Sequence, residues 1–266
     1  MMTKQHKIWS LYGLLGFCLA AGHLGGTIVF SDDFPGSALD TEKWTSGGQW
    51  NPSVVVDNGT LALGNLQTAH FSYARTVEDG FNFHENAYTV TVGLASFDQP
   101  DWSNAANSWD NMEYYFAIGP AENRGDVNSS DTSRHGFSFN LRWRRDAGLD
   151  ITTRSNIGVP TQSLSEVPAT VQFSVDATSF SLDLLDAGGT ALYSESGLHG
   201  IGAGTLSSYN FLLMHQAGFT MQVDGVTTRH YGVVDSVSII PEPSSYAAIL
   251  GLFGLALLLW HRKRKG

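Results

Sequence analysis

Residues 88–96 read YTVTVGLAS, and every second residue from Tyr88 to Leu94 is apolar. An extended chain places these side chains on one face and the two threonines on the other, which is the period of a half-buried strand. The stretches GFSFNLRW at 136–143 and TVQFSVD at 170–176 repeat the pattern. Since no segment between the two ends of the chain has sustained helical spacing, this part of the protein is predicted to be all-β.

The turns between these segments indicate antiparallel pairing. Asp57-Asn58-Gly59 separates SVVV from TLALG, and Asn-Gly readily adopts the positive φ angles of a tight hairpin. The segment from Asp186 to Gly189 separates FSLDLL from TALYSE in the same way. About a dozen strands at this spacing predict two packed antiparallel sheets. Because no linker-like stretch interrupts them, residues 27–240 are expected to form one β-sandwich.

Four stretches of this region resemble a known fold group. VFSDDFPGSALDTEKWTSGG at 29–48 and VVVDNGTLALGN at 54–65 look like the first strands of the concanavalin A-like lectins and glucanases, which include LamG-like domains. ATVQFSVDATSFSLDLLDAGG at 169–189 and YGVVDSVSII at 231–240 are similar to a hairpin and the final strand of that group. The resemblance implies a jelly-roll sandwich, and a fold of this kind does not by itself define a reaction.

The N-terminus has the features of an export signal. Lys4 and Lys7 precede an apolar stretch from Ile8 to Ala21, and small residues follow it. This stretch is too short for a dedicated membrane span, so residues 1–26 are predicted to be a signal peptide with a short helix. The single cysteine of the chain, Cys18, lies inside it, so the exported domain must be stable without disulfides.

The charge of the remaining chain restricts its partners. Residues 22–240 hold 24 acids and 9 bases, a formal balance of 9 − 24 = −15. Such a surface repels nucleic-acid phosphates over a Debye length of about 8 Å in physiological salt. Nucleic acid is therefore excluded as an expected partner.

The C-terminus combines three unlike features in order. Pro241, Glu242 and Pro243 come first, and 15 uncharged residues follow from Tyr246 to Trp260. About 20 residues usually cross a bilayer, so this run predicts a transmembrane helix of minimal length. The run ends in a basic cluster, which acts as a stop-transfer signal and stays cytoplasmic. The cluster consists of Arg262, Lys263, Arg264 and Lys265.

Residues 241–266 resemble the PEP-CTERM sorting signal of Gram-negative bacteria. The resemblance implies recognition by an exosortase and cleavage near Pro241, Glu242 and Pro243. It also implies export through the inner membrane, anchoring by the C-terminal helix before processing, and final location in the cell envelope or outside the cell. Proteins with this signal are associated with exopolysaccharide production.

The carboxylates give little indication of catalysis. Laminarinase-like glycosidases of this fold carry an E-x-D-x-E or E-x-D-x-x-E strand, and this sequence has none. Asp110 and Glu113 are three residues apart and would point to opposite faces of a strand. Asp40 and Glu42 are two apart in a turn-like segment. Both pairs are interpreted as solvated carboxylates, and the protein is expected not to be an enzyme.

A glycan site has more support from the sequence. DQPDWSNAANSWDNMEYYF at 98–116 sets aromatic rings among Asp and Asn, a composition that suits stacking on sugar rings and bonding of their hydroxyls. The candidate contacts are Trp102, Trp109, Asp110 and Tyr114. The alternative is that these rings cover the end of the hydrophobic core.

Two further stretches leave alternatives open. Arg142, Arg144 and Arg145 could receive an anionic polysaccharide, or they form an outward strand face paired with Asp146 and Asp150. DVNSSD at 126–131 starts like a calcium loop but lacks the Gly and Glu that an EF-hand needs. It is interpreted as a polar loop, with structural calcium as the alternative and no other cofactor expected.

The sequence as a whole predicts an exported, exosortase-sorted protein of the cell envelope or extracellular matrix, with a non-catalytic structural or binding role. A glycan-binding lectin-like module is the first alternative. A divergent glycoside hydrolase of the laminarinase-like type is the second.

Overall fold

The computed structural model describes thirteen stretches of the chain, which are residues 29–49, 52–65, 70–100, 102, 111–122, 124–127, 129, 131–152, 161–217, 221–223, 226–228, 230–242 and 260. The predicted signal peptide, Trp109, Asp110, Pro243 and the basic cluster lie outside these residues. So does the predicted membrane span, apart from Trp260. Within the described stretches, no helix has the length and apolar character needed to cross a bilayer.

The first sheet has eight strands, and all its neighbouring strands pair antiparallel. Its order is β13 (Ala191–Leu198), β12 (Ser179–Leu185), β11 (Thr170–Val175), β6 (Tyr88–Ser96), β17 (His230–Pro241), β4 (Thr60–Asn65) and β3 (Pro52–Asp57). The short β1 (Phe30–Asp32) pairs with the second half of β17. The β3–β4 hairpin turns at Asn58 and Gly59 with φ angles of 50° and 84°, as the Asn-Gly pair predicts.

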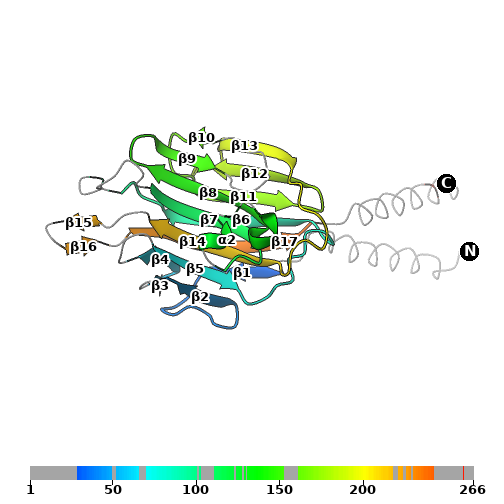
Figure 1. The fold of residues 1–266 in the computed structure, drawn as a ribbon, viewed down its shortest axis with the longest axis horizontal. Coiled ribbons are helices and arrows are strands. Elements are labelled where there is room, and N and C mark those ends of the chain that lie inside the picture. Colours follow the sequence, from blue (N-terminus) through cyan, green and yellow to red (C-terminus); the bar gives the residue numbers. More distant parts are fainter. Residues whose placement is uncertain are drawn as a thin grey trace, which may run out of the picture.

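The second sheet has seven antiparallel strands and packs against the first. Its order is β10 (Gln162–Ser163), β9 (Gly148–Thr152), β8 (Phe137–Arg144), β7 (Asn111–Gly119), β14 (Asn210–Ala217), β5 (His70–Thr76) and β2 (Trp44–Gly48). A separate hairpin of β15 (Met221–Val223) and β16 (Val226–Thr228) extends from one end of the sandwich (Figure 1). Two one-turn helices, α2 (Arg124–Val127) and α3 (Thr132–His135), lie between β7 and β8 in the chain.

The core between the sheets follows the predicted alternation and is rich in aromatic rings. In β6, the side chains of Tyr88, Val90 and Val92 are buried, and the threonines between them are half-exposed. Phe137 of β8 stacks on Phe173 of β11 in the opposite sheet, with ring centroids 5.5 Å apart. The prediction of a two-sheet antiparallel jelly-roll sandwich is confirmed.

Asp32, at the end of β1, joins the first strand to the second sheet. Its carboxylate is buried and accepts hydrogen bonds from the Phe34 backbone N–H at 2.9 Å and from Trp44 Nε1 at 2.7 Å. Lys43 Nζ lies 3.8 Å from the same carboxylate. Asp32 and Trp44 of the opening stretch therefore have a structural role, since their hydrogen bond holds the Trp44 ring in the core.

The seven-stranded sheet differs from the prediction of half-buried strands. The outward-facing Ser138 and Asn140 of β8 are buried, whereas the alternation predicts that they face solvent. A second apolar cluster covers part of this outer face, and it includes Val127 of α2 together with Ala121. Its other members are Phe71, Tyr115, Ala117, Leu212 and Met214, from β5, β7 and β14. The chain that follows β7 thus folds back over its own sheet, which gives the sheet a second buried face.

Candidate functional site

Alternation along β7 decides which of the predicted residues can meet a ligand. Tyr114 is fully buried between the sheets, where its ring lies 6.0 Å from Phe97 and 5.3 Å from Phe116. Burial raises the pKa of Tyr114 far above its ordinary value, so its hydroxyl stays protonated. The prediction of Tyr114 as a glycan contact is wrong, because its ring faces the core. Trp102 is half-buried, and Trp109 and Asp110 lie outside the described residues.

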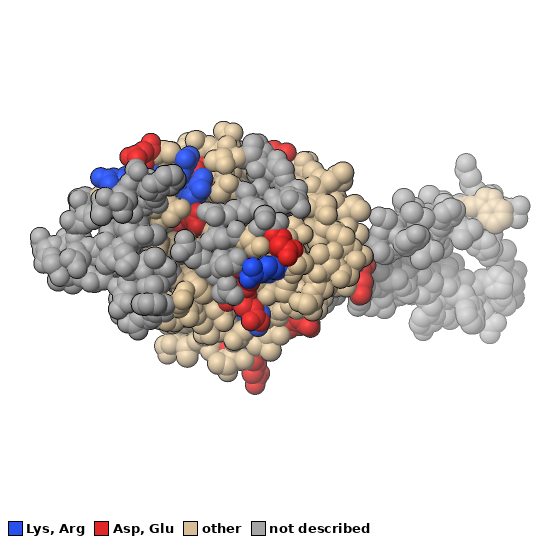
Figure 2. All heavy atoms as spheres, in the orientation of Figure 1, with Lys and Arg blue, Asp and Glu red and all other residues tan. Residues whose placement is uncertain are grey.

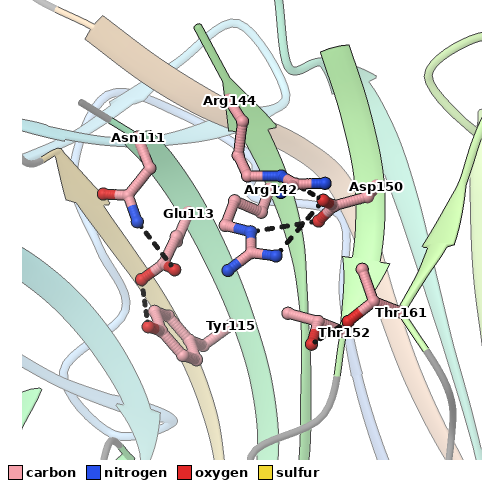
Figure 3. A network of polar contacts seen from close by, with 8 residues as sticks. All are labelled: Asn111, Glu113, Tyr115, Arg142, Arg144, Asp150, Thr152 and Thr161. Atoms are coloured by element: carbon pink, nitrogen blue, oxygen red, sulfur yellow. Dashed lines mark hydrogen bonds and ion pairs between the residues drawn. The ribbon is translucent and has the colours of Figure 1, made fainter. Parts of the chain in front are cut away.

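The neighbours of Tyr114 point to the opposite face. Glu113 and Tyr115 lie on the outer face of the seven-stranded sheet, and both are buried. The Tyr115 hydroxyl donates a short hydrogen bond to Glu113 Oε2, and Asn111 Nδ2 donates to Glu113 Oε1 at 3.1 Å (Figure 3). The interpretation of Glu113 as a solvated carboxylate is therefore wrong. Two neutral donors of its own strand stabilise its buried carboxylate.

The strand register extends this arrangement into a row of polar side chains. Glu113 pairs across the ladder with Arg142 of β8 and with Gln216 of β14, and Arg142 pairs with Asp150 of β9. We call Asp150, Arg142, Glu113 and Gln216 the polar row. It crosses four adjacent strands on one face of the sheet, so segments distant in the sequence contribute to one surface.

Asp150 is the most strongly bound member of the polar row. Arg142 donates to it in a bidentate manner, with Nε 3.1 Å from Oδ1 and Nη2 3.2 Å from Oδ2. Arg144 Nε lies 2.6 Å from Oδ2 in a second ion pair, and Asp150 is fully buried (Figure 3). The interpretation of the arginines as an outward face paired with Asp150 is confirmed for Arg142 and Arg144. On the face seen in Figure 2, described basic side chains lie beside acidic ones.

Two amide side chains on this face have unused hydrogen-bonding groups. Asn140, which pairs with Tyr115 and Thr152, is fully buried, and neither its Oδ1 nor its Nδ2 has a hydrogen-bond partner among the described residues. Gln216 is also buried, and its Oε1 has no hydrogen-bond partner in the described part of the chain. A buried amide without hydrogen bonds is costly, so such groups in native proteins normally meet water or a ligand.

The same face has a half-exposed polar rim and an aromatic border. Asn111 and Arg144 are half-exposed. They form the next cross-strand residue pair on this face, two residues or about 7 Å along the strands from Glu113 and Arg142. Asn140 lies on the opposite side of the polar row, two residues from Arg142 on β8. On the other side, Tyr73 of β5 is half-buried and stacks on Phe71, with ring centroids 6.4 Å apart and planes inclined by 18°. The polar groups thus lie between a charged rim and an aromatic surface.

Glu113 and Asp150, the two carboxylates of the polar row, are not spaced as a retaining glycosidase pair. Glu113 and Asp150 lie on strands separated by β8, so their Cα atoms are about 10 Å apart at the usual strand spacing. Retaining glycosidases hold their carboxyl groups about 5 Å apart. Asp150 is also neutralised by two arginines. Asp40 and Glu42 are exposed in a turn where Asp40 accepts from the Glu42 backbone N–H, as the sequence predicts.

The segment interpreted as a polar loop uses its acids for structure. Asp126 forms an ion pair with Arg134 at 2.8 Å, and Asp131 caps α3 by accepting from the Ser133 backbone N–H. Asn128 and Ser130 lie outside the described residues. In the portion of the chain that is described, no three His, Cys, Asp or Glu side chains cluster as a metal site would require.

Comparison with known proteins supports the fold and assigns no function. No protein-family model matches the chain, and no curated protein sequence matches it. A solved structure of a protein of unknown function from Shewanella oneidensis MR-1 has a TM-score of 0.52 and 15% identity, covering 92% of this chain and 96% of that one. Lectin II from Ulex europaeus has a TM-score of 0.49 and 11% identity, covering 81% of this chain and 99% of the lectin.

A glycoside hydrolase is similar to the same extent. The endo-β-1,3-glucanase from Pyrococcus furiosus has a TM-score of 0.47 and 12% identity, with 81% of this chain and 94% of the glucanase covered. At such low identity a likeness shows the fold alone. The chain is therefore an all-β jelly-roll protein.

Proposed function

We propose that this protein is exported, sorted to the cell envelope or extracellular matrix, and binds polysaccharide without cleaving it. The proposed binding region is the outer face of the seven-stranded sheet at the border of the polar row, where Asn111, Arg144 and Tyr73 are half-exposed. The observation that supports this most directly is a pair of buried amides, since Asn140 Oδ1, Asn140 Nδ2 and Gln216 Oε1 have no hydrogen-bond partner among the described residues.

The chemistry of these amides suits a sugar. An amide side chain offers two donors and a two-lone-pair acceptor, and a sugar hydroxyl can both donate and accept. Water can satisfy the amides in the free protein, and sugar hydroxyls can replace it on binding. The half-buried Tyr73 ring adds an apolar surface of the kind that packs against the C–H face of a sugar. Because Asp150 holds both Arg142 and Arg144, this face favours a neutral glycan over a strongly anionic one.

Binding to a panel of neutral and acidic bacterial polysaccharides tests the glycan proposal. Gln216→Leu removes the amide with little change in length, and we expect it to weaken binding at least tenfold, which corresponds to about 1.4 kcal/mol. Gln172→Leu is the matched control, since Gln172 lies on β11 in the other sheet. Binding of no polysaccharide, or equal affinity of both variants, would refute the site. Release of reducing ends during the incubation would refute the non-catalytic role.

The sorting proposal rests on the order of features in residues 241–266. An exosortase-type enzyme is the expected partner, with the basic cluster Arg262 to Lys265 stopping transfer and Pro241 to Pro243 marking the processing region. Replacing Pro241, Glu242 and Pro243 together by Ala should leave the full-length chain in the membrane fraction of an exosortase-bearing host. Unchanged processing and location of the triple variant would contradict this proposal.

A further inference from the structure

The first two residues of the Pro-Glu-Pro segment, Pro241 and Glu242, are part of the folded sandwich. Pro241 is the last residue of β17 and lies opposite Tyr88 of β6 in the ladder. The Glu242 backbone N–H donates to the Ala87 carbonyl oxygen at 2.7 Å. Since proline has no backbone N–H, this is the only backbone donor of the tripeptide, and the sandwich uses it.

The side chain of Glu242 is held as well. Thr89 Oγ1 donates to Glu242 Oε1 at 2.7 Å, and Thr89 Oγ1 lies 2.7 Å from Ser174 Oγ of β11. A threonine hydroxyl has one hydrogen, so when Thr89 donates to Glu242, Ser174 must donate to Thr89. The contact therefore has a direction: Ser174 donates to Thr89, and Thr89 donates to the carboxylate. It joins residues 153 positions apart in the sequence.

We propose that Thr89 is a positioning residue that holds the processing segment on the sandwich and slows its cleavage. This inference rests on the proposed processing at Pro241 to Pro243. An enzyme that cleaves a peptide needs it extended, with its backbone groups free to pair with the enzyme. While Glu242 pairs with Ala87 and Thr89, its backbone N–H and its carboxylate Oε1 are engaged by the sandwich, so the end of β17 must detach first.

The length of chain after Glu242 strengthens the constraint. Only three residues separate Glu242 from Tyr246, where the apolar run begins. The four steps from Glu242 to Tyr246 span at most about 14 Å when fully extended. Detachment of Glu242 and Pro241 lengthens this reach by about 7 Å. Release of the Thr89 contact thus both frees the segment and moves it further from the sandwich toward a membrane enzyme.

Thr89→Val tests the contact because valine keeps the shape of threonine and lacks the hydroxyl. Loss of one hydrogen bond to an exposed carboxylate should raise the detached population about fivefold. Thr89→Ser keeps the hydroxyl and should restore wild-type behaviour. Thr91→Val is the matched control, because Thr91 lies two residues along on the same outward face of β6.

Two measurements on these variants separate the contact from its consequence. Amide hydrogen exchange at Glu242, followed by NMR, should speed up about fivefold in Thr89→Val and not in Thr89→Ser or Thr91→Val. Pulse-chase of the full chain in an exosortase-bearing host should show faster processing of Thr89→Val by a similar factor. Unchanged exchange at Glu242, or processing of Thr89→Val that is unchanged or slower while exchange rises, would overturn the proposal.

The triple alanine variant, run in parallel, distinguishes this failure from failure of the sorting proposal. Normal processing of the triple variant contradicts cleavage at this segment. A block in the triple variant together with normal processing of Thr89→Val leaves the sorting proposal intact and refutes the role of Thr89.

Discussion

The Asp32 carboxylate offers the sharpest test of how the sandwich is held together. In Asp32→Ala, the Phe34 backbone N–H and Trp44 Nε1 both lose their acceptor, and both residues are buried. Leaving a buried donor unpaired costs about 1–3 kcal/mol, so the two together cost about 2–6 kcal/mol. The ion pair with Lys43 adds little, because the Lys43 side chain is 41% exposed and the separation is 3.8 Å.

A loss near 4 kcal/mol is a large fraction of the total stability of a domain, which is about 5–15 kcal/mol. Urea unfolding followed by tryptophan fluorescence measures the free energy of unfolding by linear extrapolation. For a domain of this size the loss corresponds to a fall in Tm of about 8–16 °C. Asp33→Ala is the matched control, since Asp33 is exposed, and we expect it to change stability by less than about 0.5 kcal/mol. The reasoning is refuted if Asp32→Ala costs less than about 1 kcal/mol or no more than Asp33→Ala.

Two further predictions concern the stability of the domain: the effect of a substitution at Gly232 and the effect of pH through two histidines. Gly232→Ala should destabilise the protein by about 1–3 kcal/mol, because an added Cβ would lie 2.1 Å from Tyr114 Cδ2, and a Tyr114→Leu background should reduce that loss. Burial and then the nearby His199 lower the pKa of His84 below 6.5, and burial lowers the pKa of His135. The unfolded chain therefore binds more protons just below pH 6.5, so the free energy of unfolding should be highest above this pH and decrease as the pH falls toward the lowered values. Urea unfolding at pH 7.5 and 5.5 measures the difference, and a His84→Phe, His135→Phe double variant that keeps the full pH dependence would contradict the assignment.

Local patterns in the sequence predicted the fold class because each depends on neighbouring residues. The alternation in 88–96 and the Asn58-Gly59 turn act over a few residues, and both are found as predicted. The pairing of the 170–175 strand with the 179–185 strand follows from the same local logic. Such signals identify strands and hairpins and leave open which face of a strand is covered.

The candidate site could not be predicted in the same way. Glu113, Asn140, Asp150 and Gln216 come from four strands, and only the register places them on one surface. Tyr114 faces the core and Glu113 and Tyr115 face outward, and the sequence does not say which face of β7 meets the core. One signal was available: the stretch FLLM at 211–214 is continuously apolar, which is typical of a strand buried on both faces.

The sequence by itself determined that the chain is strand-rich, acidic between its ends and free of cysteine after residue 18, and it is the basis of the proposed export and sorting. These properties depend on composition or on short sequence patterns, so they do not require knowledge of the tertiary structure. Only the tertiary structure decided that the outer face of the seven-stranded sheet is buried and polar, and that Glu242 is held by Thr89. The physical reason is that side chains alternate with period two, so which face they occupy is local, whereas what covers that face comes from distant segments.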